Sequence, residues 1–305
     1  MPLHEDVIIM TPDGEKPLKS LKKVSVILDG NGAFQNVLAT IIDDYHGYFH
    51  EFCCKAIPFT FKCTADQLIF CAKDVPKTDD TDKITYDKPT FVRAGSISIY
   101  EYMAMPYLQE ITEVLPISLP IEKDAFWHFV GVTLNRIALG KMPKLEASRV
   151  TIQLFAEELK LVKFPEELNK INTVGGLVIL NPSFSNYISQ IIQNPMQLLY
   201  LPLKCQAALY EGFNFDHERP PSSDNIQMMF VMWYIYCRVN KKLANIQSTK
   251  GREYRLNFLN NALPCHDYIW FRISDIRVTI EKCKIYHFKT ETPSILARNF
   301  IVRPQ

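Results

Sequence analysis

Residues 268–289 read YIWFRISDIRVTIEKCKIYHFK, and this stretch decides the fold class. Its runs of aromatic and β-branched residues are typical of strands. The pattern predicts three strands, at Tyr268–Ile273, Arg277–Lys282 and Ile285–Lys289. Earlier in the chain, further strand candidates lie at Val24–Leu28, Ile57–Lys62, Gln67–Lys73, Phe91-Val92 and Ser96–Tyr102. Together these segments predict a β-rich trunk built from N-terminal, middle and C-terminal strands.

The sequence pattern in the middle of the chain is typical of helices. Glu122–Leu139 carries an apolar stripe and is followed by Gly140 and Pro143, which are typical helix-stop signals. The longest helical candidate is Ile226–Ile246, which Asp224 can cap, and one more helix is expected at Tyr254–Leu263. The fold class expected is therefore α+β, with a largely helical insertion.

Three regions follow from this reading. Residues 1–88 form an N-terminal helix and strand region that ends in a polar segment, and residues 89–140 and 264–305 form the β-rich trunk. Residues 141–263 form a mainly helical arm. Strands are also expected at Val114–Ile121, an edge strand or connector because of its prolines, and at Val150–Phe155.

Residues 33–52 are predicted to be a helix, because apolar residues recur there at spacings of three and four. On such a helix His46 and His50 would share one face, and Cys53 or Cys54 would offer a further zinc ligand. No second paired ligand element occurs elsewhere, so aromatic packing at a helix end is the favoured interpretation. The preceding turn, Asp29-Gly30-Asn31-Gly32, is expected to be tight rather than to bind phosphate.

The remaining motifs do not point to catalysis. Cys265, His266 and Asp267 are consecutive, whereas the partners of a cysteine hydrolase meet in space from separate parts of the chain. Gly175-Gly176 precedes a strand, whereas phosphate loops follow one. No catalytic residue, metal ligand or cofactor is therefore predicted, and the chain is not expected to be an enzyme.

Composition excludes several classes of protein. The chain has 305 residues with 34 basic and 33 acidic side chains, and 47% of its residues are hydrophobic, which excludes disorder. The longest apolar run, Met228–Cys237, is shorter than the roughly 20 residues of a membrane span. No secretory signal is recognised, so the eight cysteines are expected to be free buried thiols in a cytosolic or nuclear protein.

The near-neutral sum conceals a polarised chain. Residues 1–150 have a net charge of −4 from 16 basic and 20 acidic residues, whereas residues 238–305 have a net charge of +8 from 13 and 5. A basic cluster lies at Lys241, Lys242, Lys250, Arg252 and Arg255. With Tyr254, Trp270, Phe271 and Tyr286 interleaved, it can bind single-stranded nucleic acid by phosphate contacts and stacking. The alternative is a solvated basic face that meets an acidic protein surface.

The run Met228–Cys237 reads MMFVMWYIYC, and a helix of this sequence is apolar on all sides. It is either a central core helix or part of an obligate interface between chains. In the second case Phe230, Trp233 and Tyr234 would be its anchors, because large buried aromatics dominate binding energy.

The order of elements resembles the dimer-forming triplex subunit of herpesvirus capsids. The local similarity lies in Tyr100–Gly140, with its proline-bearing apolar segment, and in Asn36–Ala72. This resemblance implies a viral minor capsid protein without catalytic residues, which pairs with a second copy of itself and a different third subunit. It also implies contact with the major capsid protein, in the virion capsid and, during assembly, in the host nucleus. The alternative function is nucleic-acid binding, in the manner of a viral nucleoprotein, through the basic C-terminal third.

Overall fold

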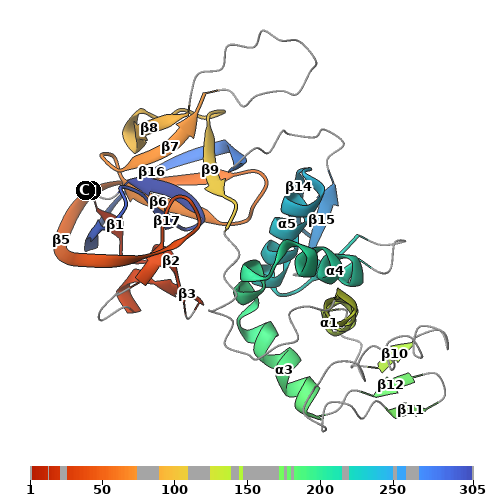
Figure 1. The fold of residues 1–305 in the computed structure, drawn as a ribbon. Helices are drawn as coiled ribbons and strands as arrows, with labels where there is room; N and C mark the ends of the chain where they lie inside the picture. Colours follow the sequence, from red (N-terminus) through yellow and green to blue (C-terminus); the bar gives the residue numbers. More distant parts are fainter. Residues whose placement is uncertain are drawn as a thin grey trace. The chain divides into compact units, whose positions relative to one another are not determined.

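The computed structural model describes residues 2–12, 14–20, 26–73, 89–108, 124–138, 144–146, 172–174, 177–179, 182–214, 220–249, 253–258 and 268–303. The chain divides into two compact units (Figure 1). Unit 1 comprises Met1–Gln109, Lys241–Leu243 and Asn260–Gln305, and unit 2 comprises Glu110–Asn240 and Ala244–Leu259. The predicted fold class is confirmed: the protein is α+β, with a β-rich unit from both ends of the chain and helices in the middle.

The unit boundaries differ from those of the predicted regions. Residues 1–88 do not stand alone, because β7 (Leu68–Ala72) pairs with both β8 (Thr90–Arg93) and β9 (Tyr102–Pro106). The helix α1 (Asp124–Ala138), which the prediction placed in the trunk, belongs to unit 2, where it packs against α4 (Leu203–Phe213).

Unit 1 is organised around two long antiparallel strands, β5 (Phe34–Cys54) and β16 (Tyr268–Thr290). They pair from Ile273 opposite Cys54 to Thr290 opposite Val37. The shorter strands are β1 (Leu3–His4), β2 (Ile8–Thr11), β3 (Gly14–Pro17), β4 (Val26–Leu28), β6 (Thr60–Thr64), β17 (Ile295–Ala297) and β18 (Phe300–Arg303). Short 3-10 turns lie at Leu18–Ser20 and Ala94–Ser96.

Four of these strands close a ring. β1 pairs with β16 and β6, β6 pairs with β5, and β5 pairs with β16. Phe52 and Phe61, which face each other across β5 and β6, are fully buried in the core of this unit. A closed ring leaves no strand edge at the paired positions, which is how small sheets avoid exposed hydrogen-bonding groups.

The helix predicted over residues 33–52 is wrong, because the segment is the strand β5. Three of the apolar residues that suggested a helix, Leu38, Ile41 and Ile42, are exposed on it. The backbone hydrogen bonds of β5 go to β16 and β6, and its β-branched and aromatic residues suit that pairing. The turn before it is confirmed: the Asp29 carboxylate accepts the N–H groups of Asn31 at 2.8 Å and Ala33 at 2.9 Å.

Other strand predictions have mixed outcomes. The three C-terminal strands are one continuous strand, β16, and Ser96–Tyr102 is mostly outside β9, which begins at Tyr102. The strands predicted at Ile57–Lys62 and Gln67–Lys73 are confirmed as β6 and β7. Val114–Ile121 and Val150–Phe155 lie outside the described residues.

Unit 2 contains the helices and two small sheets. Beyond α1 and α4, its elements are β10 (Lys144–Glu146), β11 (Asn172–Val174), β12 (Leu177–Ile179), α3 (Pro182–Gln193), the 3-10 helix Pro195–Tyr200, β13 (Ser222–Ser223), α5 (Ile226–Asn240), β14 (Ala244–Ser248) and β15 (Tyr254–Phe258). The predicted helix at 226–246 is confirmed as far as Asn240. The helix predicted at 254–263 is wrong, because residues 254–258 form β15.

Two glycines let α1 and α4 cross with their backbones in contact. A Cβ atom on Gly131 would overlap the carbonyl oxygen of Leu209 and lie 2.7 Å from the nitrogen of Phe213. A Cβ atom on Gly212 would overlap the carbonyl oxygen of His128. The amide of Asn135 also donates to the carbonyl of Phe213 at 2.6 Å. Within the described part of the chain, no helix is both long and apolar enough to cross a membrane.

Candidate functional sites

The first candidate site is built on α5. Its N-terminus is capped by Asn225, whose side-chain oxygen accepts the N–H groups of Gln227 at 3.0 Å and Met228 at 3.1 Å, and not by Asp224 as predicted. Residues 228–238 are all buried. The Trp233 indole donates to the carbonyl of Ala244 at 2.6 Å, which ties the helix to β14. The helix therefore supports a small sheet in which β15 lies between β13 and β14. Figure 1 shows α5 beside β14 and β15.

The register of β14 and β15 separates their side chains into two faces. Ala244 and Ile246 are buried and lie opposite Phe258 and Leu256, on the face toward α5. The ring centroids of Phe258 and Tyr236, a residue of α5, are 4.8 Å apart. Because side chains alternate along a strand, the residues between these positions point to the opposite face.

That opposite face, which we call the polar face, carries only polar side chains. Asn245 lies opposite Asn257, and Gln247 lies opposite Arg255. Gln247, Arg255 and Asn257 are exposed and Asn245 is half-buried. Arg255 donates from Nε at 3.2 Å and Nη2 at 2.8 Å to one oxygen of Glu253. Hydrogen bonds from Ser222 and Arg255 lower the pKa of Glu253, so this acid is ionised and orients the guanidinium at neutral pH.

The predicted basic cluster is only partly assembled here. Arg255 lies on the polar face, and Lys242 is exposed in unit 1. Lys241, also in unit 1, lies 4.2 Å from the ring centroid of Tyr107. Lys250 and Arg252 lie outside the described residues.

The predicted stacking platform is not available for bases. Trp270, Phe271 and Tyr286 are buried, and only Tyr254 is half-exposed. Bases cannot stack on Trp270, Phe271 and Tyr286, because these three rings are core residues of unit 1, and Tyr254 lies in unit 2. The signal that sequence reasoning missed was the alternation of Asn, Gln and Arg along residues 245–257.

The three predicted interface anchors are core residues of unit 2. Phe230, Trp233 and Tyr234 are each 0–1% exposed, and the rings of Phe230 and Trp233 stack with centroids 5.6 Å apart. Their own chain covers these side chains. The structure therefore fits the interpretation of Met228–Cys237 as a central core helix rather than as an interface between chains. Their side chains offer no surface to a second copy in this structure.

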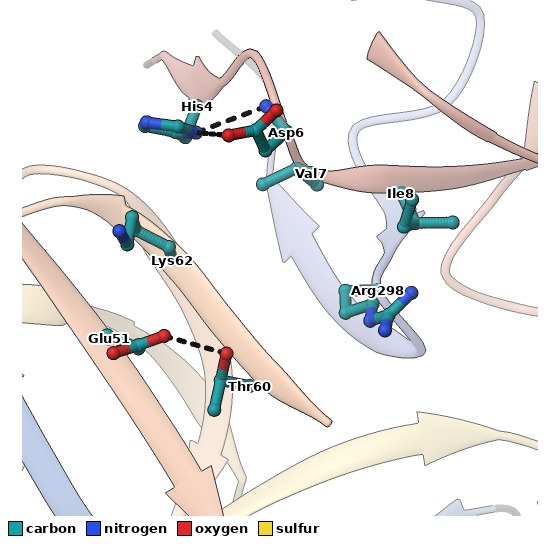
Figure 2. Close-up of a pocket in the computed structure, with 8 residues that line it drawn as sticks. All are labelled: His4, Asp6, Val7, Ile8, Glu51, Thr60, Lys62 and Arg298. Atoms are coloured by element: carbon teal, nitrogen blue, oxygen red, sulfur yellow. Dashed lines mark hydrogen bonds and ion pairs between the residues drawn. The ribbon is translucent and has the colours of Figure 1, made fainter. Parts of the chain in front are cut away.

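The second candidate site is a pocket of about 280 Å³ in unit 1. Figure 2 shows how it lies between the segment that leads into β2, the strands β5 and β6, and the turn between β17 and β18. Its lining is formed by His4, Asp6, Val7, Ile8, Glu51, Thr60, Lys62 and Arg298. Two of the eight lining residues are apolar and six are polar, so the pocket is more polar than most small-molecule sites, and a ligand here would be held mainly by charged and hydrogen-bonding groups.

Most charged groups around the pocket are neutralised by neighbours. Glu281 binds Lys62 at 2.7 Å and lies 3.1 Å from Nε2 of His4, and Lys62 is the main reason that the pKa of Glu281 is lowered. Lys19 pairs with Asp6 at 2.7 Å. Glu51 accepts a hydrogen bond of 2.8 Å from the hydroxyl of Thr60.

The histidines that were weighed as zinc ligands do not meet in the described structure. His46 is exposed, and His50 is half-buried with its ring 6.5 Å from that of Phe52; burial lowers the pKa of His50. Among the residues that the structure describes, no group of three His, Cys, Asp or Glu side chains could hold a metal ion. Cys53 and Cys283 are half-buried free thiols, and Cys54, Cys63, Cys71, Cys205 and Cys237 are buried free thiols. Cys265, His266, Asp267 and Gly175-Gly176 lie outside the described residues.

A third feature is an apolar stripe on the two long strands. Tyr48 lies opposite Ile280, and Val278 is two residues from Ile280, so the three side chains share one face. They are 60%, 60% and 55% exposed, in the order Tyr48, Ile280, Val278. Six of the ten exposed large apolar residues in the described part of the chain lie on β5 and β16: these three, Leu38, Ile41 and Ile42.

Comparison with known proteins adds little to this geometry. No protein-family model and no curated protein matches the chain. Solved structures of the homing endonuclease I-DmoI are similar to part of it: mesophilic variants with a TM-score of 0.31 and 12% identity, and a complex with DNA and Mn with a TM-score of 0.29 and 15% identity. They cover 47% and 46% of this chain, and 99% of each I-DmoI chain. Similarity at this level does not establish a shared fold and carries no functional weight.

Proposed function

We propose that the protein binds double-stranded nucleic acid through the polar face of β14 and β15. The observation that carries the proposal is the set of side chains there: Asn245, Gln247, Arg255 and Asn257. Arginine is the side chain that best fits the major-groove edge of guanine, and asparagine and glutamine fit that of adenine. The supporting face of the sheet is held by α5, so the four side chains project from a rigid platform.

The dimensions of the platform suit a major groove. A groove about 12 Å wide admits a two-stranded β-ribbon, and DNA-binding proteins are known that read it in this way. Same-face neighbours on a strand are about 7 Å apart, which is close to the rise of two base pairs. Gln247 and Arg255, which are directly opposite each other, would contact adjacent bases at the centre of the site.

The test is binding of full-length protein to labelled 20-base-pair duplexes of random sequence, followed by selection of the tightest binders. Replacing Gln247 and Arg255 together by alanine removes two base contacts and should weaken binding to selected duplexes at least ~10-fold, because each bidentate contact contributes about 1–3 kcal/mol. Fluorescence anisotropy at two salt concentrations measures both affinity and the phosphate contribution.

The matched control is the double replacement of Gln190 and Gln193 by alanine, since both are exposed polar residues on α3 of the same unit. This control should bind as the unmodified protein does. Absence of duplex binding at low salt, or equal loss in the control, would refute the proposal.

A second candidate function is the assembly role that the resemblance to capsid triplex subunits implies, and the apolar stripe favours it. A contiguous patch of exposed apolar side chains often marks a site where another protein binds. In this proposal a second copy covers Tyr48, Val278 and Ile280, and the different third subunit and the major capsid protein complete the assembly. Pairing then uses β5 and β16 rather than the buried aromatic residues of α5.

Sedimentation velocity tests this second function. We expect the unmodified protein to self-associate, and replacement of Val278 and Ile280 together by lysine to shift it to monomer, because buried lysines without partners cost several kcal/mol. Ile99→Lys, at an apolar residue that is 46% exposed elsewhere in unit 1, is the control and should leave association unchanged. A protein that is monomeric at high concentration rules out pairing through this surface.

A further inference from the structure

Two opposite charges in the pocket of unit 1 have no ion-pair partner within 4 Å among the described residues, although Arg277 acts electrostatically on Glu51 and Glu15 acts on Arg298 over a longer distance. Over the described residues, no cation lies within 4 Å of the Glu51 carboxylate and no carboxylate lies within 4 Å of the Arg298 guanidinium. The hydroxyl of Thr60 is the donor to Glu51. Arg277, which faces Glu51 across β5 and β16, pairs instead with Asp275 at 3.0 Å. Both unmatched groups line the same cavity (Figure 2).

The backbone at Arg298 is unusual for arginine. Arg298 and Asn299 form the turn between β17 and β18 with φ angles of 45° and 72°. Two-residue turns of this kind favour glycine, asparagine or aspartate, because other residues meet steric strain in the left-handed region. Asn299 follows this preference and Arg298 does not, so the turn itself gives no reason for an arginine.

Arg298 is nevertheless held firmly in place. Its backbone N–H donates to the carbonyl of Ile8 at 2.7 Å. Its guanidinium lies 4.4 Å from the ring centroid of Phe59. Burial lowers the pKa of Arg298, and the more distant Glu15 carboxylate partly opposes this effect. An arginine remains charged under these conditions and has five N–H donors in a rigid fork, which suits a carboxylate.

The other charges restrict the ligand. Lys62 and His4 are occupied by Glu281, and Asp6 is occupied by Lys19. A simple anion at Arg298 would share the pocket with the Glu51 carboxylate, and a simple cation at Glu51 would share it with the Arg298 guanidinium. A ligand that carries both charges satisfies both groups.

We infer that this pocket binds a free α-amino acid, with its carboxylate on Arg298 and its ammonium group on Glu51. The volume of about 280 Å³ holds a molecule of this size. Val7, which is buried, and Ile8, which is half-buried, line the pocket beside the charged groups and offer an apolar surface to a small aliphatic side chain. The site is in unit 1 and is independent of duplex binding by unit 2.

Isothermal titration calorimetry of the full chain with the twenty common amino acids tests this inference. We expect binding of small aliphatic amino acids, and no binding of the same molecules as N-acetyl derivatives or methyl esters, each of which loses one charge. Acetate and methylamine alone should also fail. The inference would be overturned if the N-acetyl derivatives bound as tightly as the free amino acids. It would also be overturned if no amino acid of the panel bound at millimolar concentration.

Variants separate binding from folding. Arg298→Gly removes the guanidinium and relieves the backbone strain, so it should lower affinity at least ~10-fold while leaving the thermal stability equal or higher. Glu51→Gln should also lower affinity. Arg272→Gln, at an exposed arginine of β16 that does not line the pocket, is the control and should bind normally. Loss of stability in Arg298→Gly with retained binding would assign a purely structural role to Arg298.

Discussion

At the scale of single residues, Gly131 and Gly212 set the distance between α1 and α4. Each glycine faces a backbone carbonyl of the other helix, so neither position has room for a methyl group. Backbone atoms cannot rotate away as a flexible side chain can, and any substitution must move a helix. These two positions are therefore fixed by packing and not by local conformation.

We expect Gly212→Ala to destabilise the folded state of unit 2 by about 1–3 kcal/mol, the usual cost of overpacking a close contact. Urea denaturation followed by tryptophan fluorescence measures the effect, since Trp127 on α1 and Trp233 on α5 are both buried in this unit. Glu211→Ala changes the exposed neighbour on the same helix and should leave the unfolding midpoint almost unchanged. Equal effects of the two substitutions would contradict the close crossing.

Residue roles were the least predictable part from sequence. The apolar run of α5 predicts burial correctly, but it cannot tell whether the cover comes from the same chain, and Phe230, Trp233 and Tyr234 are covered by their own unit. Glu51 and Arg298 are 247 positions apart in the chain and belong to no motif. Only the pairing of strands brings such residues to one pocket.

At the scale of elements, the polar bridge of Glu281 links three strands. This residue of β16 binds Lys62 of β6 and contacts His4 of β1, and Thr279 donates to it at 2.8 Å. These are neighbours in the closed ring. Because the hydrogen bond from Lys62 lowers the pKa of Glu281, the ionised carboxylate is favoured in the folded state.

The sign of the pH effect follows from this direction. The stabilisation by Glu281 is present above the ordinary glutamate pKa and is lost as the pH falls through the lowered value. We expect Glu281→Gln to lower the free energy of unfolding by no more than about 1 kcal/mol at pH 7, since the group is partly exposed. The difference from the unmodified protein should shrink as the pH falls below the ordinary glutamate pKa.

Urea denaturation at pH 7 and pH 3 checks this expectation. Lys62→Met removes the other half of the ion pair and serves as the matched variant, so its difference should also shrink at low pH. A difference that stays constant with pH would show that the substitution acts through packing.

The sequence predicted helices and strands correctly where the spacing of apolar residues fitted only one of the two. It failed where the spacing fitted both a helix and a strand. The stripe in α1 and the long run in α5 led to correct helices, and β6 and β7 were found as strands. β5 was mistaken because Val37, Leu38, Ile41 and Ile42 match a helical stripe by spacing alone. Its actual partner, β16, lies more than 200 residues away and leaves no local signal.

At the scale of the whole molecule, the excess of basic residues in the C-terminal third does not form a single basic surface. The basic C-terminal third is divided between the units: Arg255 lies in unit 2, whereas Lys241, Lys242 and the arginines of β16 lie in unit 1. The expectation of one continuous basic region came from adjacency in sequence. The insertion of one unit into the other breaks that adjacency, and only the β-rich trunk with its helical insertion was foreseen.

The ring of β1, β5, β6 and β16 has a consequence for biosynthesis. Three of its strands leave the ribosome within the first 64 residues, and the fourth begins only at Tyr268. Unit 2, whose segments lie between them, is complete before the ring can close. The nascent chain must therefore hold the long β5 strand without its main partner throughout translation of the middle, and such an unpaired strand is a site of aggregation. The strands β1, β5 and β6 can therefore complete their ring only after β16 has been synthesised. Chains truncated before residue 268 lack β16 and would depend on chaperones.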